Sequence, residues 1–138
     1  MGLPEKRAVQ EFQTNVYPGI ETEIKSLISS DVTVEVDWEN LAFQGEHAAD
    51  EYANAWQKIY FGPLLTALKA IATDDMGKQA LADKIKHVSI VASYAHDTPS
   101  GWVEVNGDTL KLQHVPDRNL EAEAERAAKL QKVLEENL

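Results

Sequence analysis

The chain has no cysteine and no long apolar run, and each absence excludes a class of protein. Without cysteine there is no disulfide, no thiolate nucleophile and no cysteine-ligated zinc site. No apolar stretch approaches the roughly 18 to 20 residues that a membrane-spanning helix needs, and no secretory leader opens the sequence. We therefore expect a soluble protein, cytoplasmic by default, that does not act on membranes.

Motifs that carry common chemistries are missing as well. The seven glycines are scattered, so no GxGxxG or GxxxxGK phosphate-binding loop occurs. The adjacent pair His96-Asp97 lies near Ser93, but without a GxSxG elbow it is typical of a polar turn rather than of a catalytic triad. His87 and His114 fall on predicted strands, where we interpret them as structural side chains. We predict neither a cofactor nor a bound metal.

Basic residues are scarce in the first third of the chain. Residues 1–51 contain eleven Asp and Glu against three Lys and Arg, a net charge of −8, and residues 52–138 contain twelve against ten, a net charge of −2. Such a field repels phosphate backbones, so nucleic acid is excluded as the expected partner. The same field steers a basic protein surface toward the chain, and it aids solubility even without a partner.

Apolar periodicity predicts the helices. Spacings of three and four residues predict helices over residues 4–28 and 52–71. Pro18 and Pro63 interrupt them, so each is either a pair of short helices or one kinked helix. Two more helices are predicted over residues 73–86 and 117–138.

Alternation of apolar and polar residues predicts the strands. It is clearest over residues 32–38, and β-branched residues favour a second strand over residues 87–95. In the first of these strands the side chains expected to face the core are Val32, Val34, Val36 and Trp38.

A hairpin is the strongest local signal. Residues 102–115 alternate on both sides of Asn106-Gly107, which suits a two-residue type I′ turn. This turn would place Val103 opposite Leu110 on the face that turns toward the core.

Together these elements predict an α+β fold in a single domain of residues 1–138. Three consecutive strands joined by short loops form a meander. We therefore expect a mostly antiparallel sheet of about four strands with helices packed on one face. The strand at residues 32–38 can join either edge of this sheet.

Glu35 and Asp37 form the first candidate site. Two residues apart on one strand, their side chains would project in parallel, roughly 6.6 to 6.8 Å apart. That separation overlaps the carboxyl spacing of inverting glycosidases, but carboxylates on one face of one strand cannot flank a substrate from opposite sides. The simpler interpretation is an acidic, solvated sheet face.

The stretch GEHAADEY adds a second acidic group. His47 and Glu51 are four residues apart, a spacing that can place two metal ligands on one helix face. No third ligand follows at a suitable spacing, and acidic residues are common at a helix start because the helix dipole favours them there. The residues assigned to a candidate binding surface are therefore Glu35, Asp37, Glu39, Glu46, His47, Asp50 and Glu51.

Trp102 is the remaining candidate. The predicted hairpin places it on the face opposite Val103 and Leu110. It is therefore either covered by a helix or exposed as an anchor for a partner.

Two functions remain open. The first is a non-catalytic protein-binding domain, of the inhibitor, immunity or adaptor kind, whose acidic first third engages a basic partner surface. The second is a small enzyme or ligand-binding protein with a pocket between the sheet and the interrupted helices, where Glu35, Asp37 and a histidine converge. The apolar stripe of the C-terminal helix, which includes Leu120, Ala127 and Leu134, also allows a homo-oligomer.

Overall fold

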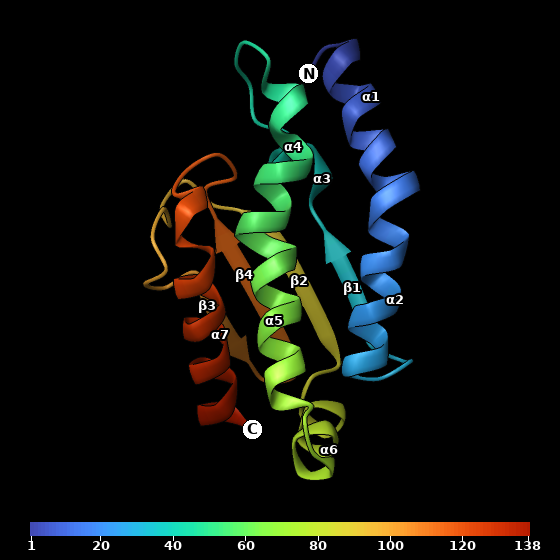
Figure 1. Ribbon diagram of the computed structural model, residues 1–138, viewed down its shortest axis with the longest axis vertical. Coiled ribbons are helices and arrows are strands. Elements are labelled where there is room, and N and C mark those ends of the chain that lie inside the picture. Colours follow the sequence, from blue (N-terminus) through green and yellow to red (C-terminus); the bar gives the residue numbers. More distant parts are fainter.

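The computed structural model describes residues 1–138 as two layers, a four-stranded sheet and a set of helices across one of its faces (Figure 1). The α+β class and the helices on one face were expected. In chain order the elements are α1 (Leu3–Glu11), the π-helical η1 (Phe12–Val16), α2 (Tyr17–Leu27), β1 (Thr33–Val36), α3 (Trp38–Leu41), α4 (Ala48–Trp56), the π-helical η2 (Gln57–Phe61), α5 (Gly62–Ile71), α6 (Asp75–Lys84), β2 (His87–Ala92), β3 (Val103–Asn106), β4 (Thr109–His114), the 3₁₀ turn η3 (Leu120–Ala122) and α7 (Glu123–Asn137).

The sheet is mixed and mostly parallel, so the prediction of a mostly antiparallel meander was wrong. Its order is β1-β2-β4-β3, with β1, β2 and β4 parallel and only β3 antiparallel to its neighbour β4. The connection over residues 93–102 is long enough to carry the chain past the central position to the sheet edge, and the hairpin then returns β4 beside β2. The buried side chains of β4 and β2 explain this order, because the central positions bury the most apolar surface.

The pairing register of the β3–β4 hairpin differs from the predicted one by two residues. Asn106 pairs with Thr109, and Val103 faces Leu112 rather than Leu110. The turn residues are Gly107, with φ of +62°, and Asp108, whose φ is not positive; this favours a type II′ turn over type I′. A shift of two residues keeps every side chain on its predicted face, because the side-chain period of a strand is two.

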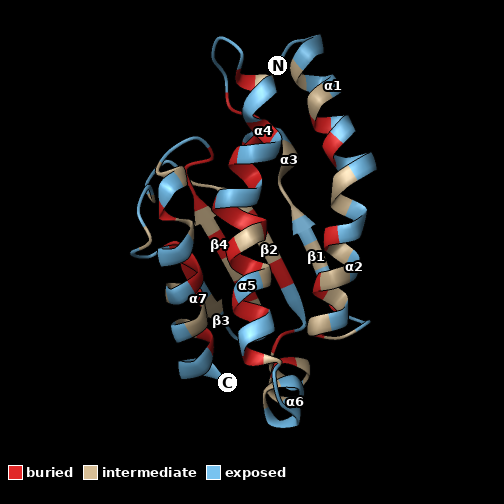
Figure 2. Ribbon diagram, in the orientation of Figure 1, coloured by how far each residue is buried: buried red, intermediate tan, exposed pale blue.

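The predicted first strand is shorter than expected. It ends at Val36, and Trp38 begins α3 instead of continuing the strand. Val32 is buried, whereas Val34, Val36 and Trp38 are partly buried against the core. The buried residues of α4, α5, α7 and the central strands gather where the helices meet the sheet (Figure 2).

The two interrupted helices stay continuous through a widened turn. The N–H of Tyr17 donates to the carbonyl of Phe12, and that of Gly62 donates to the carbonyl of Gln57, so each bond spans five residues instead of four. Both widened turns lie just before the prolines. A proline has no N–H to donate to the helix. The hydrogen-bond pattern changes locally before each proline, and the helix continues.

Aromatic rings fill the space between the widened turns and the end of β1. Phe12 packs against Trp38, Trp56 and Phe61 with ring centroids 5.7, 5.2 and 5.7 Å apart, and Tyr17 meets Trp38 edge to face at 5.1 Å. These rings occupy the place where a pocket between the interrupted helices and the sheet was expected. That space is therefore part of the core.

The apolar stripe of α7 faces inward. Ala127, Leu130 and Leu134 are buried against the rest of the molecule, while Ala124 and Leu138 are exposed. The stripe thus packs within the chain, and the outer face of α7 is mainly charged. No helix is both long and apolar enough to cross a bilayer.

Two glycines beside the helical prolines provide a matched test of the second widened turn. A Cβ on Gly62 would lie 2.5 Å from the backbone carbonyl oxygen of Gln57, whereas a Cβ on Gly19 meets nothing within 4 Å. Gly62→Ala is expected to lower the free energy of unfolding by about 1 to 3 kcal/mol through overpacking. Gly19→Ala is expected to raise it by about 0.5 to 1 kcal/mol, because alanine favours the helix. Urea unfolding curves measure both, and equal effects of the two substitutions would contradict the widened turn at Gly62.

Candidate functional site

The carboxyl ends of the three parallel strands lie at the same end of the molecule as the chain's N-terminus and the loop between α3 and α4 (Figure 1). In open sheets with parallel strands, ligands commonly bind at this end. The predicted site residues that the fold brings there are Asp37, Glu39, Glu46, His47, Asp50 and Glu51. We call this region the carboxyl-end surface.

Two predicted site residues lie elsewhere. Glu35 is exposed, on the sheet face opposite to Val34 and Val36, which pack against the core. Trp102 is fully buried in the core, so it is not an exposed anchor. The prediction assumed that Trp102 belongs to the strand and faces away from Val103. The strand β3 begins only at Val103, so the alternation does not include Trp102, and Trp102 and Val103 are both buried.

Glu35 and Asp37 do not form a parallel pair of carboxylates. The strand ends between them, and Asp37 occupies the position before α3. Its carboxylate accepts a hydrogen bond of 2.7 Å from the side-chain amide of Asn40. Asp37 therefore has a local structural partner at the start of α3.

His47 stands just before α4 in the left-handed backbone region, with φ of 60°. Its Nε2 lies 3.5 Å from a carboxylate oxygen of Glu46, and its Nδ1 lies 3.8 Å from one of Asp50. All three side chains are more than three-quarters exposed, at 78%, 90% and 78%. His47 forms no ion pair with Glu51, the residue four positions on, and no group of three or more His, Asp or Glu is arranged to hold a metal ion.

A hollow of about 320 Å³ opens on the carboxyl-end surface. Tyr94, from the loop after β2, is 65% exposed at this hollow, and Phe43 contributes a buried ring. Glu39 provides the charged side chain in the lining, to which Met1 also belongs, and no lysine or arginine takes part. The complete lining is Met1, Glu39, Asn40, Ala42, Phe43, Gln44 and Tyr94.

The carboxylates of this surface have no lysine or arginine partner. The ion pairs that involve lysine are Lys25–Glu21 within α2 and Lys69–Glu23 between α5 and α2. Glu39, Glu46, Asp50 and Glu51 form no ion pair with lysine or arginine. Apart from His47, which lies beside Glu46 and Asp50, no basic side chain forms an ion pair with these carboxylates.

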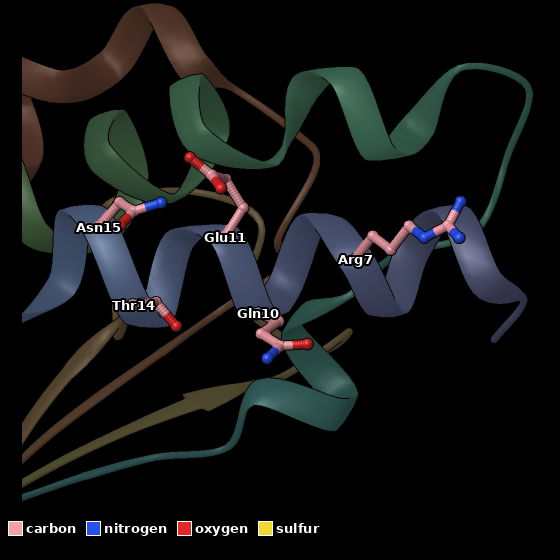
Figure 3. A pocket seen from close by; sticks show the side chains of 5 residues that line it. All are labelled: Arg7, Gln10, Glu11, Thr14 and Asn15. Atoms are coloured by element: carbon pink, nitrogen blue, oxygen red, sulfur yellow. The ribbon is translucent and has the colours of Figure 1, made fainter.

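Two other hollows are lined by other parts of the chain. One follows α1 and η1, where Gln10 and Thr14 point away from Glu11 and Asn15 and all the lining residues come from one continuous helix (Figure 3). The other, of about 430 Å³, lies where α5, α6 and the end of α7 meet, beside the exposed Met76. The pocket expected between the sheet and the interrupted helices would be lined by Tyr17, Tyr60, Phe61 or Trp38, and none of these residues lines any of the three hollows.

A buried polar cluster at the end of β4 was not foreseen from the sequence. His114 and Arg126 are both fully buried, and Arg126 Nε and Nη2 lie 3.3 and 3.1 Å from His114 Nε2. The guanidinium also donates to the backbone carbonyls of Arg118, at 3.2 Å, and Asn119, at 2.5 Å. The Tyr60 hydroxyl donates to the carbonyl of His114 at 2.6 Å. In the sequence Arg126 stands among other charged residues of α7, so no pattern indicated that its side chain would be buried.

The hydrogen bonds of the cluster decide the protonation state of His114. Its Nδ1 is 2.7 Å from the carbonyl of Val115, which can only accept, so Nδ1 carries the hydrogen. Nε2 is then the acceptor for the arginine. Burial lowers the pKa of His114 below its usual value, and burial likewise lowers the pKa of Arg126 and raises that of Tyr60.

Ser93 and His96 meet in the loop after β2. Ser93 Oγ lies 2.8 Å from His96 Nδ1, and the His96 N–H donates to the Ser93 carbonyl, which closes a turn. No hydrogen bond joins Asp97 to His96, so the three residues do not form a triad. The interpretation of this stretch as a polar turn agrees with that geometry.

Comparison of the chain with protein-family models, with curated proteins and with solved structures finds no match. Its function has to be argued from its own surface and side chains.

The Tyr60 hydroxyl provides a test of the buried cluster. Tyr60→Phe is expected to lower the free energy of unfolding by about 1 kcal/mol, because one buried hydrogen bond is lost while the His114 carbonyl still accepts from the Ser93 N–H. Tyr94→Phe is the matched control, since that side chain is exposed, and it should change stability by less than about 0.5 kcal/mol. Urea denaturation measures both variants, and equal losses would argue against the buried bond.

Proposed function

We propose that the protein is a non-catalytic binding module whose carboxyl-end surface engages a basic segment of a partner protein. The observation that carries this proposal is the pairing of an exposed aromatic ring, Tyr94, with a carboxylate, Glu39, in the lining of one hollow. Neither the hollow nor the carboxylates around it have a lysine or arginine of this chain as a partner.

This combination suits a cationic side chain. Lysine and arginine have an apolar stem and a charged head, so the stem can lie against Phe43 and Tyr94 while the head approaches Glu39. An exposed cation over a tyrosine ring contributes about 0.5 to 1 kcal/mol. A volume of about 320 Å³ is at the lower limit of the roughly 300 to 1,000 Å³ typical of small-molecule pockets, which fits one or two inserted side chains.

The residues around the hollow also favour a cationic partner. Glu46, Asp50 and Glu51 are exposed on the same end of the molecule, and residues 1–51 have a net charge of −8. Carboxylates spread around a contact site raise the association rate of a basic partner and disfavour acidic ones. An inhibitor or immunity-type protein that neutralises a cationic enzyme, or an adaptor for a basic protein, would use such a surface.

The enzyme alternative has less support. Its pocket was to lie between the interrupted helices and the sheet, where aromatic rings now fill the space. Glu35 lies on the opposite face of the sheet from the helices, so it does not converge with Asp37 on a substrate. The binding proposal uses residues that the fold does bring together.

A labelled octalysine peptide tests the binding surface directly. Its affinity, measured by fluorescence anisotropy at low salt, should fall about threefold to tenfold in Glu39→Gln and in Tyr94→Ala, because each removes one contact worth roughly 0.5 to 1.5 kcal/mol. Glu104→Gln is the matched control: it removes the same charge from an exposed position on β3, and it should leave the affinity nearly unchanged.

Salt and peptide charge provide two further checks. The affinity for octalysine should decrease as the ionic strength rises, because exposed charges are screened. A labelled octaglutamate peptide should not bind. The proposal is wrong if Glu104→Gln weakens binding as much as Glu39→Gln, because the peptide would then be responding to net charge alone.

A further inference from the structure

The buried cluster around His114 joins parts of the chain that are far apart in sequence. His114 ends β4, Tyr60 belongs to η2 and Arg126 belongs to α7. The guanidinium also reaches the carbonyls of Arg118 and Asn119 in the segment between β4 and η3. The cluster therefore connects the sheet with the helix layer at the carboxyl end of β4.

The backbone of the same strand end also positions the loop over residues 93–102. The N–H of Ser93 donates to the His114 carbonyl at 2.9 Å, and the N–H of Val115 donates to the His96 carbonyl at 2.8 Å. The side-chain amide of Asn119 donates to the carbonyl of Asp97. Trp102, at the far end of the loop, packs edge to face on the His114 ring with centroids 6.5 Å apart. Any loosening at His114 therefore reaches this loop from both ends.

The geometry permits only a neutral imidazole at His114. Nδ1 donates to a carbonyl and Nε2 accepts from a guanidinium that is itself positively charged. A proton on Nε2 would remove that acceptor and bring two positive charges within 3.1 Å of each other. Arg126 has no carboxylate partner, and its Nη1 is buried without a hydrogen bond, so nothing inside the cluster offsets a second positive charge.

Charged groups around the cluster act in both directions. Asp97 favours a proton on His114, whereas Arg126 and His96 oppose it. Burial disfavours the charged form of the arginine and Glu121, Glu123 and Glu125 favour it, and the guanidinium keeps its proton throughout the acid range. Around Tyr60 the titratable groups are Arg126, Tyr94 and Asp117.

We propose that His114 and Arg126 form an acid-sensitive latch: a proton on His114 Nε2 releases the loop over residues 93–102 and the segment over residues 115–120 while the rest of the core stays folded.

The direction follows from proton linkage. In the closed latch the pKa of His114 is lowered, and in the open form it returns toward about 6.5. Above about pH 6.5 both forms are neutral and the latch keeps its full stability. As the pH falls below this value the open form binds the proton first, so the closed form loses stability down to its own lowered pKa.

The latch has a consequence for binding, and this part rests on the proposed function. Tyr94 lies in the loop that the latch holds and also lines the hollow with Glu39. Opening at acid pH would displace the aromatic wall of that hollow. A basic partner would then be held at neutral pH and released in an acidic environment.

Hydrogen exchange followed by mass spectrometry tests the latch on the whole chain without any partner. After correction for the intrinsic exchange rate, the opening equilibrium of peptides covering residues 93–102 and 115–120 should rise up to about fivefold between pH 6.5 and 5.5. Peptides from α5 and β2 should keep their protection. His114→Gln, which retains a carbonyl acceptor but does not titrate, should remove the pH dependence.

Two more variants separate the latch from a general effect of acid. Arg126→Met removes the guanidinium that holds the carbonyls of Arg118 and Asn119 and the positive charge beside His114, so it should raise the opening of residues 115–120 at neutral pH and weaken its dependence on pH. His87→Gln removes an exposed histidine on β2 and should behave like the unmodified chain.

Several outcomes would overturn the latch. They are unchanged protection of both segments in the unmodified chain at pH 5.5, simultaneous loss of protection in all segments, or a pH dependence that persists in His114→Gln. The first two need no variant, so they hold even if a substitution prevents folding. Because no partner is present, a failure of octalysine binding at neutral pH leaves this test unaffected.

Discussion

The central position of β4 is the constraint on which the rest of the structure depends. Its inward side chains, Leu110, Leu112 and His114, are all completely buried, and its two edges pair with β2 and β3. A strand with this much buried surface gains most in the middle of a sheet, where helices cover it and both rows of backbone groups find partners. The parallel pairing of β4 with β2 follows, and with it the gathering of strand ends at one end of the molecule.

The same position explains why a histidine is buried in the core. His114 continues the inward alternation of β4, so it enters the core where an apolar residue would normally stand. Its polar atoms then require partners, which Arg126 and the Val115 carbonyl supply. The arginine in turn satisfies carbonyls of the irregular segment before η3. One buried imidazole thereby organises a corner that has no regular secondary structure.

The uncovered face of the sheet has a polar character that suits water. Glu35, Ser89, Lys111 and Glu104 form one row across the four strands, and Lys111 lies directly opposite Glu104. Opposite charges at such positions stabilise a sheet by a few tenths of a kcal/mol up to about 1 kcal/mol. Sheets rich in parallel strands usually have both faces covered, and here the charged and hydroxyl side chains allow one face to remain open. This is the setting in which Glu35 lies, away from the carboxyl-end surface.

Much of the local structure could be predicted from residue patterns. The interrupted helices, the strands and the inward faces of the hairpin follow from periodicity, because these depend on neighbours within a few residues. A two-residue error in the hairpin left Val103 and Leu110 on their predicted face for the same reason. The gathering of Glu39, Glu46, His47 and Asp50 was also predictable, since they are close in the chain.

Strand order and the buried cluster could not be predicted in this way. Whether β4 pairs with β2 depends on the path of the loop over residues 93–102, and a loop's path is decided by what its ends pack against. The burial of Trp102 and the meeting of Tyr60, His114 and Arg126 join segments that are far apart in sequence.

The sequence by itself determined the helices, the strand faces and the concentration of acid in the first third, because periodicity and charge are local properties of the chain. Only the tertiary structure decided that Tyr94 shares a hollow with Glu39 and that Arg126 meets a neutral histidine. Contacts across the whole chain are chosen by packing and hydrogen-bond satisfaction together, and no short stretch of residues contains that information.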